Sequence, residues 1–328
     1  MGPVEIILIV LAALAVMALG GLAVMLKITL PISRNVYREQ LVRTSPEKWG
    51  RVCSAPDNEE QLAMWNSGVA WMEQNKHRIR LVQTQNDGFD LYGEYFDYGC
   101  DRCVIILPGR CESLMYSYYF APPYEKAGFN ILVIDTRCHG KSGGTYNTIG
   151  VKESGDVLAW AKLAKEQLGN RQVWFHGICI GTSSALFALS DPKCPDYVKG
   201  LVTEGCFVSF RETFKRHMMA MGRPLFPVLD LVMLQINRHT GTNVYRQKPI
   251  RAIRRIRRDH RVLFLYGEKD IFSIPEKSRK LFAACAAEDK KLVWFGEGGH
   301  SHLRINNTDA YDQAIVDFFN ETACRGGS

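Results

Sequence analysis

A cysteine stands between two glycines in the stretch Gly177-Ile178-Cys179-Ile180-Gly181, directly after an apolar run at residues 173–176. This layout is typical of a strand that ends in a nucleophile elbow, a turn so tight that only residues without bulk fit two places before and after the nucleophile. Residues 182–189 can continue as a helix, and a helix N-terminus favours the negative charge of a thiolate. The stretch therefore predicts a nucleophilic Cys179; the alternative is a buried core cysteine in a strand-to-helix turn.

Two apolar runs farther along the chain end in turns that carry a candidate acid and a candidate base. Residues 262–266 lead to Asp270, and residues 292–295 lead through a glycine-rich turn to His300. A histidine can take the proton of a nucleophile, and a carboxylate can hold the imidazole in the productive tautomer. Cys179, Asp270 and His300 are thus predicted to form a catalytic triad.

Two earlier apolar runs also end in turns. Residues 104–107 lead into Pro108-Gly109-Arg110, and residues 131–134 lead into Asp-Thr-Arg-Cys-His-Gly-Lys-Ser-Gly-Gly at residues 135–144. The second turn closely resembles the Asp-x-Arg-x-His-Gly-x-Ser-x-Gly stretch of the α/β-hydrolase superfamily. With the elbow and the acid and histidine turns, it supports a resemblance to that superfamily over roughly residues 76–322. Within it, the chain is similar to the bacterial serine aminopeptidase-like and esterase-like branch.

The resemblance implies an α/β fold, a mostly parallel sheet with helices on both faces and a small helical cap. It also implies an oxyanion hole formed by the backbone N–H groups of Arg110 and Ile180. His300 is preferred to His302 as the base, because superfamily histidines often follow glycine. Glu204 stays open as an alternative acid, since some hydrolases supply their acid from the end of the preceding strand.

The nucleophile departs from most of that branch, which uses serine. A cysteine at the elbow is similar to dienelactone hydrolases and to acyl-CoA thioesterases and acyltransferases. The expected reaction is hydrolysis of a thioester, ester or lactone of a small-molecule acyl substrate, with no metal or organic cofactor. The alternatives are an acyltransferase that uses the same acyl-enzyme, and a catalytically silent membrane-tethered binding protein. The oligomeric state stays open.

The apolar pattern of the rest of the chain predicts the strands and helices that position these turns. Residues 77–84 and 91–98 are predicted to be two antiparallel strands, and residues 157–168 an amphipathic helix. An insertion at residues 207–250 is rich in methionine and leucine and is predicted to form a helical cap. Its apolar side chains either line an acyl pocket or pack the cap onto the domain. The hydrolase domain is predicted to span residues 76–325.

A long apolar run opens the chain, with no charged residue from Ile6 to Leu26. About 20 apolar residues span a bilayer as a helix, so residues 5–27 are predicted to be a transmembrane helix and residues 28–75 a juxtamembrane connector with short helices. A cleaved signal peptide is the alternative, but its apolar core is shorter and follows a basic start. Six basic residues lie between residues 27 and 51 and none before residue 6, so the positive-inside rule predicts a single-pass protein whose catalytic domain faces the cytoplasm.

Composition agrees with one membrane-anchored α/β domain. Ten cysteines at irregular spacings suit a reducing compartment, and the lone pair Cys100 and Cys103 makes a zinc site improbable. The net charge of +7 falls partly in the connector, where it would meet anionic lipid head groups. No nucleic-acid-binding module is visible. Six arginines within residues 251–261 are open to two interpretations, a solvated helix face or a grip for a phosphate of coenzyme A or a lipid head group.

Overall fold

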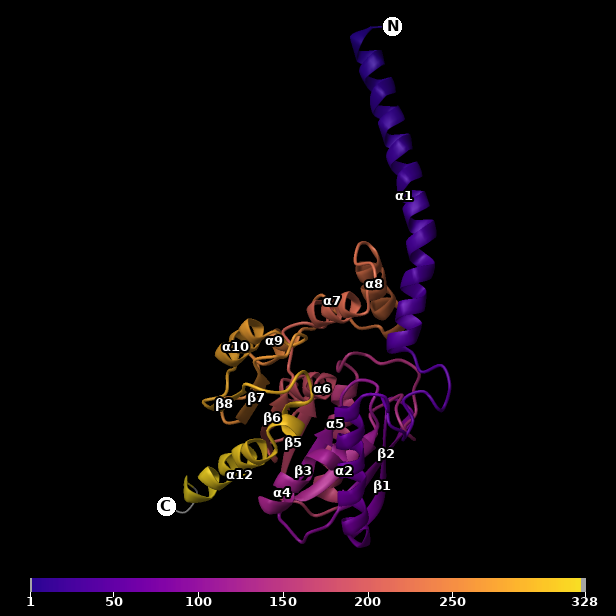
Figure 1. Ribbon diagram of the computed structural model, residues 1–328. Coiled ribbons are helices and arrows are strands. Elements are labelled where there is room, and N and C mark those ends of the chain that lie inside the picture. Colours follow the sequence, from indigo (N-terminus) through magenta and orange to yellow (C-terminus); the bar gives the residue numbers. More distant parts are fainter. Residues whose placement is uncertain (1, 326–328) are drawn as a thin grey trace.

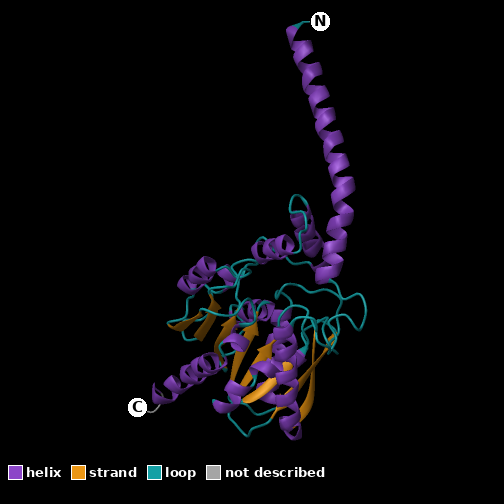
Figure 2. Ribbon diagram, viewed as in Figure 1, coloured by secondary structure: helices purple, strands orange, loops and turns teal. Residues whose placement is uncertain are grey.

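The computed structural model describes residues 2–325, and side chains as far as residue 321. Eight strands form one sheet, flanked by helices (Figures 1 and 2). The strands are β1 Ile79–Asn86, β2 Phe89–Phe96, β3 Arg102–Leu107, β4 Asn130–Ile134, β5 Gln172–Ile178, β6 Val198–Glu204, β7 Arg261–Gly267 and β8 Asp289–Phe295. The helices are α1 Pro3–Leu41, α2 Glu59–Asn75, α3 Leu114–Ser117, α4 Pro122–Lys126, α5 Glu153–Glu166, α6 Ile180–Leu189, α7 Phe210–Ala220, α8 Val228–Thr240, α9 Pro249–Ala252, α10 Pro275–Ala284, α11 Leu303–Asn306 and α12 Thr308–Arg325.

The strand order is β1-β2-β4-β3-β5-β6-β7-β8. β1 pairs antiparallel with β2, and β2 pairs antiparallel with β4, whereas the pairs from β4 to β8 are all parallel. The predicted mostly parallel sheet with an antiparallel opening is confirmed. Because parallel strands share one direction, their carboxyl ends meet at a single edge, and ligands bind there in open α/β sheets.

Apolar side chains cover both faces of the sheet. One buried cluster joins the sheet to α5, α6, α9 and α10, and the other joins it to α2, α4 and α12. The interior strands β3, β4, β5 and β7 are buried along almost their whole length, as expected for strands covered on both faces. This two-sided core holds the carboxyl edge of the sheet rigid.

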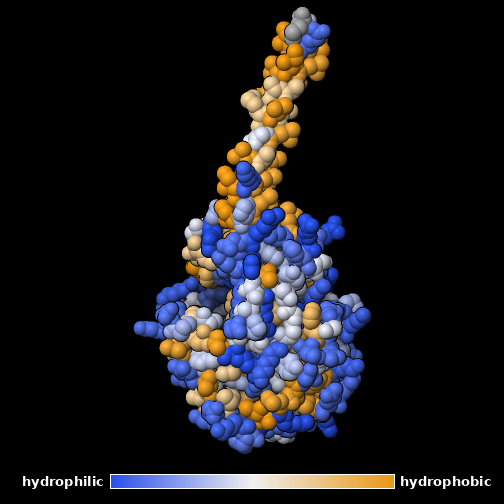
Figure 3. Space-filling view, turned by 90° about the vertical axis from the view of Figure 1, so that its right-hand side faces the viewer, coloured by the Kyte–Doolittle hydropathy of each residue, from blue (hydrophilic) through white to orange (hydrophobic). Residues whose placement is uncertain are grey.

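Helix α1 leaves the domain and projects away from it (Figure 1). It is 39 residues long, about 58 Å at 1.5 Å per residue, and is the only helix in the described part of the chain that is long and apolar enough to cross a membrane. Its outer part is an apolar surface that contrasts with the largely hydrophilic domain (Figure 3). Sequence alone placed the end of this helix near residue 27; the helix continues to Leu41 because its last turns have a partner, the cap.

The cap consists of α7 and α8, which lie beside the domain end of α1 (Figure 1). Val36, Tyr37 and Leu41 of α1 are buried, in one apolar cluster with α7 and α8. Tyr37 stacks on His239 of α8 with the ring centroids 5.3 Å apart. The proximal part of α1 is therefore an integral part of the cap.

Helix α2 lies within the segment that the sequence analysis treats as a connector. Its Trp71 packs on Phe96 of β2, with ring centroids 4.8 Å apart, and Met64 is also buried in the core. The indole N–H of Trp71 donates to Glu125 at 3.0 Å. α2 is thus part of the domain core rather than a tether.

Candidate active site

Cys179 lies between the end of β5 and the start of α6, at the carboxyl edge of the sheet. Its φ is 53° and its ψ is −112°, a backbone conformation that residues other than glycine rarely adopt. A Cβ at position 177 would lie 2.4 Å from the backbone of Thr182, and one at position 181 would lie 2.2 Å from the carbonyl oxygen of Leu107. Only glycine fits at either position, so the sharp turn predicted around Cys179 is present.

His300 and Asp270 meet at the same edge, from the turns after β8 and β7. Nδ1 of His300 lies 2.9 Å from Oδ2 of Asp270 and 3.1 Å from Oδ1. The N–H groups of Phe272 and Ser273 donate to Oδ1 of Asp270 at 2.9 Å and 2.8 Å. Burial raises the pKa of Asp270, but His300 and Ser273 lower it by more, to about 2. Asp270 is therefore an ionised carboxylate that can orient the imidazole.

The other ring nitrogen of His300, Nε2, is buried and has no hydrogen-bond partner among the described residues. Burial lowers the pKa of His300, but the charges of Asp270 and Cys179 raise it by more, so that the pKa ends well above its usual value. Gly205 lies flat against the ring, because a Cβ there would be 2.9 Å from Cε1 of His300. The imidazole ring thus lies between Asp270 and Gly205, and its Nε2 is available for proton transfer.

Glu204, the alternative acid, has other partners. Its carboxylate accepts a hydrogen bond from the hydroxyl of Tyr311 at 2.6 Å and from the N–H of Leu303 at 3.3 Å. Burial raises the pKa of Glu204 to about 7, although these hydrogen bonds oppose the shift. The geometry favours Asp270 as the partner of His300.

The loop after β3 lies beside the nucleophile. A Cβ on Gly109 would be 3.7 Å from Cβ of Cys179. The N–H of Gly109 donates to Glu112 at 2.9 Å, and the N–H of Cys111 donates to Nε2 of His139 at 3.3 Å. These bonds hold the loop on both sides of Arg110, whose N–H is one of the two predicted oxyanion donors.

The second predicted donor is the N–H of Ile180. Ile180 is the first residue of α6, where backbone N–H groups have no partner within the helix. Such N–H groups, together with the helix dipole, favour a negative charge next to the elbow.

A chain of polar side chains beside the elbow is not predicted from the sequence. The side-chain amide of Gln61, on α2, donates to Glu112 at 3.2 Å, and its Oε1 lies 2.8 Å from Nε2 of His302. Burial raises the pKa of Glu112. His302 therefore positions the loop through Gln61, and its other ring nitrogen faces Glu60 at 3.8 Å rather than Asp270. Sequence separation hides this chain, since no local pattern links residues 61, 112 and 302.

Residues 135–144 support the site rather than contact it. His139 is buried and stacks on Trp49, and burial lowers its pKa to about 4, so that its neutral ring can accept the N–H of Cys111. Arg137 binds Asp156 through two hydrogen bonds of 2.6 Å. The motif that carried the resemblance thus fixes the loop that contains Arg110.

The cap closes over Cys179. Phe207, Phe214 and Met218 belong to a buried cluster against which the partly buried Cys179 packs. His217 of α7 stacks on Phe272 with centroids 3.9 Å apart, and its ring lies 6.4 Å from that of His300. Apolar side chains of this kind beside Cys179 suit the acyl group of a substrate.

The described residues contain no cluster of three or more His, Cys, Asp or Glu side chains that could hold a metal ion. Cys103 is buried in β3, at the start of the strand and therefore at the opposite edge of the sheet from Cys179.

Comparison with known proteins agrees with this architecture. A family model described as the alpha/beta hydrolase fold matches residues 102–222. An esterase of Pyrococcus furiosus superposes with a TM-score of 0.62 at 22% identity, covering 76% of this chain and 95% of the esterase. An α/β-hydrolase of Vibrio vulnificus gives a TM-score of 0.61 at 16% identity over 88% of this chain and 94% of its own. The fold is therefore the α/β-hydrolase fold.

Sequence relatives occur in a bacterium and in two yeasts. YqkD of Bacillus subtilis is 24% identical over 70% of this chain and 75% of its own length. The bem46 protein of Schizosaccharomyces pombe is 26% identical over 60% of each chain. A membrane protein of Saccharomyces cerevisiae is 25% identical over 60% of this chain and 63% of its own. The match thus spans less than two thirds of both yeast proteins.

Proposed function

We propose that this chain is a membrane-anchored hydrolase that cleaves a thioester, ester or lactone through Cys179, His300 and Asp270. The observation that carries the proposal is the buried His300, held by Asp270 at 2.9 Å, with its second nitrogen left unpaired next to the strained elbow of Cys179. A buried imidazole without a partner on one side is costly unless that side has a role.

The proposed reaction proceeds through an acyl-enzyme on Cys179. Nε2 of His300 takes the thiol proton of Cys179, and the sulfur attacks the carbonyl carbon of the substrate. The N–H groups of Arg110 and Ile180 receive the resulting oxyanion. Its collapse breaks the bond to the leaving group, which takes the proton from His300. Water then gives a proton to His300 and attacks the acyl-enzyme, and the thiol leaves with that proton.

The thiol nucleophile determines the preferred bonds. A thiolate is a good leaving group from a tetrahedral intermediate, so the amine of an amide is expelled less readily than the thiolate of Cys179. The thiol of a thioester, the phenol of an aryl ester and the alkoxide of a strained lactone ring are expelled more readily than that amine. Thioesters, lactones and aryl esters are therefore the expected substrates.

The first expected result is a preference among acyl donors. Thioesters and aryl esters should be hydrolysed with a kcat/KM at least about 10³-fold above that of amides with the same acyl group, because the leaving group must depart in preference to the thiolate. Steady-state assays of matched donors, with the purified chain in detergent, measure this ratio. Equal rates on amides and thioesters would contradict the proposed substrate class.

Anchoring rests on the exposed apolar part of α1. Residues 2–24 are all exposed, whereas Ser33, Val36, Tyr37 and Leu41 are buried against the cap. An unburied apolar helix needs lipid around it. The Saccharomyces cerevisiae relative is named a membrane protein, which supports this proposal.

The second expected result concerns topology. The basic residues that follow the span support a cytoplasmic hydrolase domain by the positive-inside rule. Protease added outside intact cells should leave the domain uncut, and permeabilised cells serve as the control. Digestion of the domain in intact cells would show that the domain lies outside the cell and would contradict the proposed topology.

A further inference from the structure

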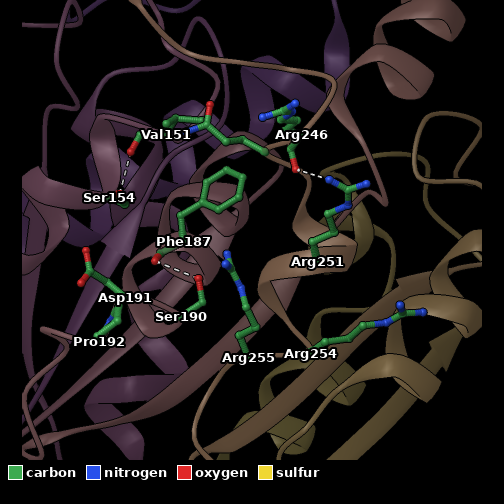
Figure 4. A pocket seen from close by; sticks show the side chains of 11 residues that line it. Val151, Ser154, Phe187, Ser190, Asp191, Pro192, Arg246, Arg251, Arg254 and Arg255 are labelled. Carbon is green, nitrogen blue, oxygen red and sulfur yellow. Dashed lines mark hydrogen bonds between the residues drawn. The ribbon is translucent and has the colours of Figure 1, made fainter.

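A basic cavity lies on the flank of the domain, away from Cys179. It has a volume of about 740 Å³ and is formed by the C-terminal half of α6, the start of α5 and the segment that joins α8 to β7. Four arginines line it, namely Arg246, Arg251, Arg254 and Arg255. Figure 4 shows Arg246, Arg251 and Arg255 arranged around the ring of Phe187.

The arginines of this segment differ in their partners, although the four that line the cavity are all exposed. Within the same segment, Arg257 pairs with Asp196 at 2.6 Å, and Arg258 pairs with Glu288 at 2.7 Å. In the part of the chain that the structure describes, none of the four arginines of the cavity forms an ion pair with a carboxylate. Asp191 also lines the cavity, but its side chain accepts the N–H of Lys193. The segment thus has arginines paired with carboxylates outside the cavity and arginines without a carboxylate partner at it, where Arg251 donates to the carbonyl oxygen of Arg246 at 3.2 Å.

The lining fits a phosphorylated ligand with a flat ring. One guanidinium group can donate two hydrogen bonds to the oxygens of a phosphate. Several guanidinium groups without a carboxylate partner in one cavity therefore match a ligand with more than one negative charge. The half-buried Phe187 offers an aromatic face beside them. A nucleotide presents both parts, since its base can stack and its phosphates can accept hydrogen bonds.

The cavity and the candidate active site share helix α6 and one apolar cluster. Val151 lines the cavity and also packs against the apolar cluster that contains Ile180 and contacts Cys179. Phe187 lies eight residues beyond Cys179 on α6, which corresponds to about 12 Å along the helix axis. A ligand with its phosphates in the cavity therefore needs an extended arm of that order to present a carbonyl to the sulfur.

We infer that this cavity binds the phosphorylated nucleotide end of the carrier in an acyl thioester, and so selects the substrate of Cys179. The inference rests on the proposed function, because the carrier is the leaving group of that reaction. It narrows the substrate class to acyl groups on a nucleotide-bearing thiol, of which acyl-coenzyme A is the available probe.

The test uses the full chain in nanodiscs of zwitterionic lipid and measures coenzyme A binding by calorimetry. Arg246→Ala and Arg255→Ala should each weaken binding about tenfold, because each removes a charge-assisted hydrogen bond to phosphate. Arg258→Ala is the matched control: it removes the same charge from the same segment, and binding should change less than twofold. Equal losses in all three variants would mean general electrostatic attraction and overturn the inference.

Two further arms separate the possible sources of phosphate. Inorganic phosphate at equal concentration should not displace coenzyme A, and nanodiscs with anionic lipid should not either. Displacement by phosphate would reduce the site to a free-phosphate site, and displacement by anionic lipid would assign it to head groups; both results overturn the inference.

Kinetics distinguish this inference from the proposed function. In Arg255→Ala the KM for an acyl-coenzyme A should rise about tenfold, while the KM for an aryl ester of the same acyl group stays unchanged. If aryl esters are cleaved but coenzyme A does not bind the intact chain, the inference fails alone. If no acyl compound is cleaved, the proposed function fails, whatever the binding result.

Discussion

Replacing Cys179 with alanine should abolish turnover of every acyl substrate, by a factor of at least about 10⁴. The reason is that no other described side chain combines the elbow conformation, the contact with the oxyanion loop and the proximity to His300. Alanine fits the turn, since the strain at this position lies in the backbone and not in the side chain. Loss of activity without loss of fold, verified by circular dichroism, is the expected outcome.

Cys179→Ser provides the matched comparison. A hydroxyl is a weaker nucleophile than a thiol at neutral pH and the site is shaped around the larger sulfur atom, so most of the rate should be lost while substrate binding is kept. Activity of the serine variant equal to that of the wild type would show that the cysteine has no special role. Unchanged hydrolysis by the alanine variant would contradict the triad.

Replacing Asp270 with asparagine should lower kcat by about 10⁴, as the loss of the orienting carboxylate does in related triads. Asp270 holds Nδ1 of His300 at 2.9 Å, and its pKa of about 2 keeps it charged at neutral pH. Asparagine has nearly the same shape, but its amide group can favour the wrong tautomer of the imidazole.

Glu204→Gln is the control for that variant. Glu204 is buried and hydrogen-bonded to Tyr311 and Leu303. The Glu204→Gln substitution should therefore lower the free energy of unfolding but change kcat little. Comparison of kcat with the free energy of unfolding separates the two effects. A large fall in kcat for Glu204→Gln together with a mild one for Asp270→Asn would transfer the role of the acid to Glu204.

The elements around the candidate site are local enough to be predicted from the sequence. Short apolar runs that end at glycine or at a polar turn identify β3 to β8, and two glycines around Cys179 identify the elbow. In a parallel sheet the ends of such strands must meet, and so the proximity of Asp270 and His300 follows from topology.

Features that depend on long-range partners could not be predicted in this way. The contact of Gln61 with Glu112 joins segments 51 positions apart, and that of Gln61 with His302 joins segments 241 apart. The extension of α1 to Leu41 depends on its packing against α8. The sequence of α1 alone does not indicate that contact. Arginines at residues 251–261 look alike in sequence, and only the fold decides which of them meet a carboxylate.

The most direct measurement of the central claim is the mass of the acyl-enzyme. The chain is mixed with an excess of an aryl ester, quenched in acid within the first turnovers and digested with trypsin. The tryptic peptide at residues 172–193 contains Cys179 as its only cysteine. The account predicts that this peptide gains the mass of the acyl group, that the gain disappears on further incubation without substrate, and that it is absent in Cys179→Ala. An acyl group on another residue, or hydrolysis without any acyl adduct on this peptide, would contradict the account.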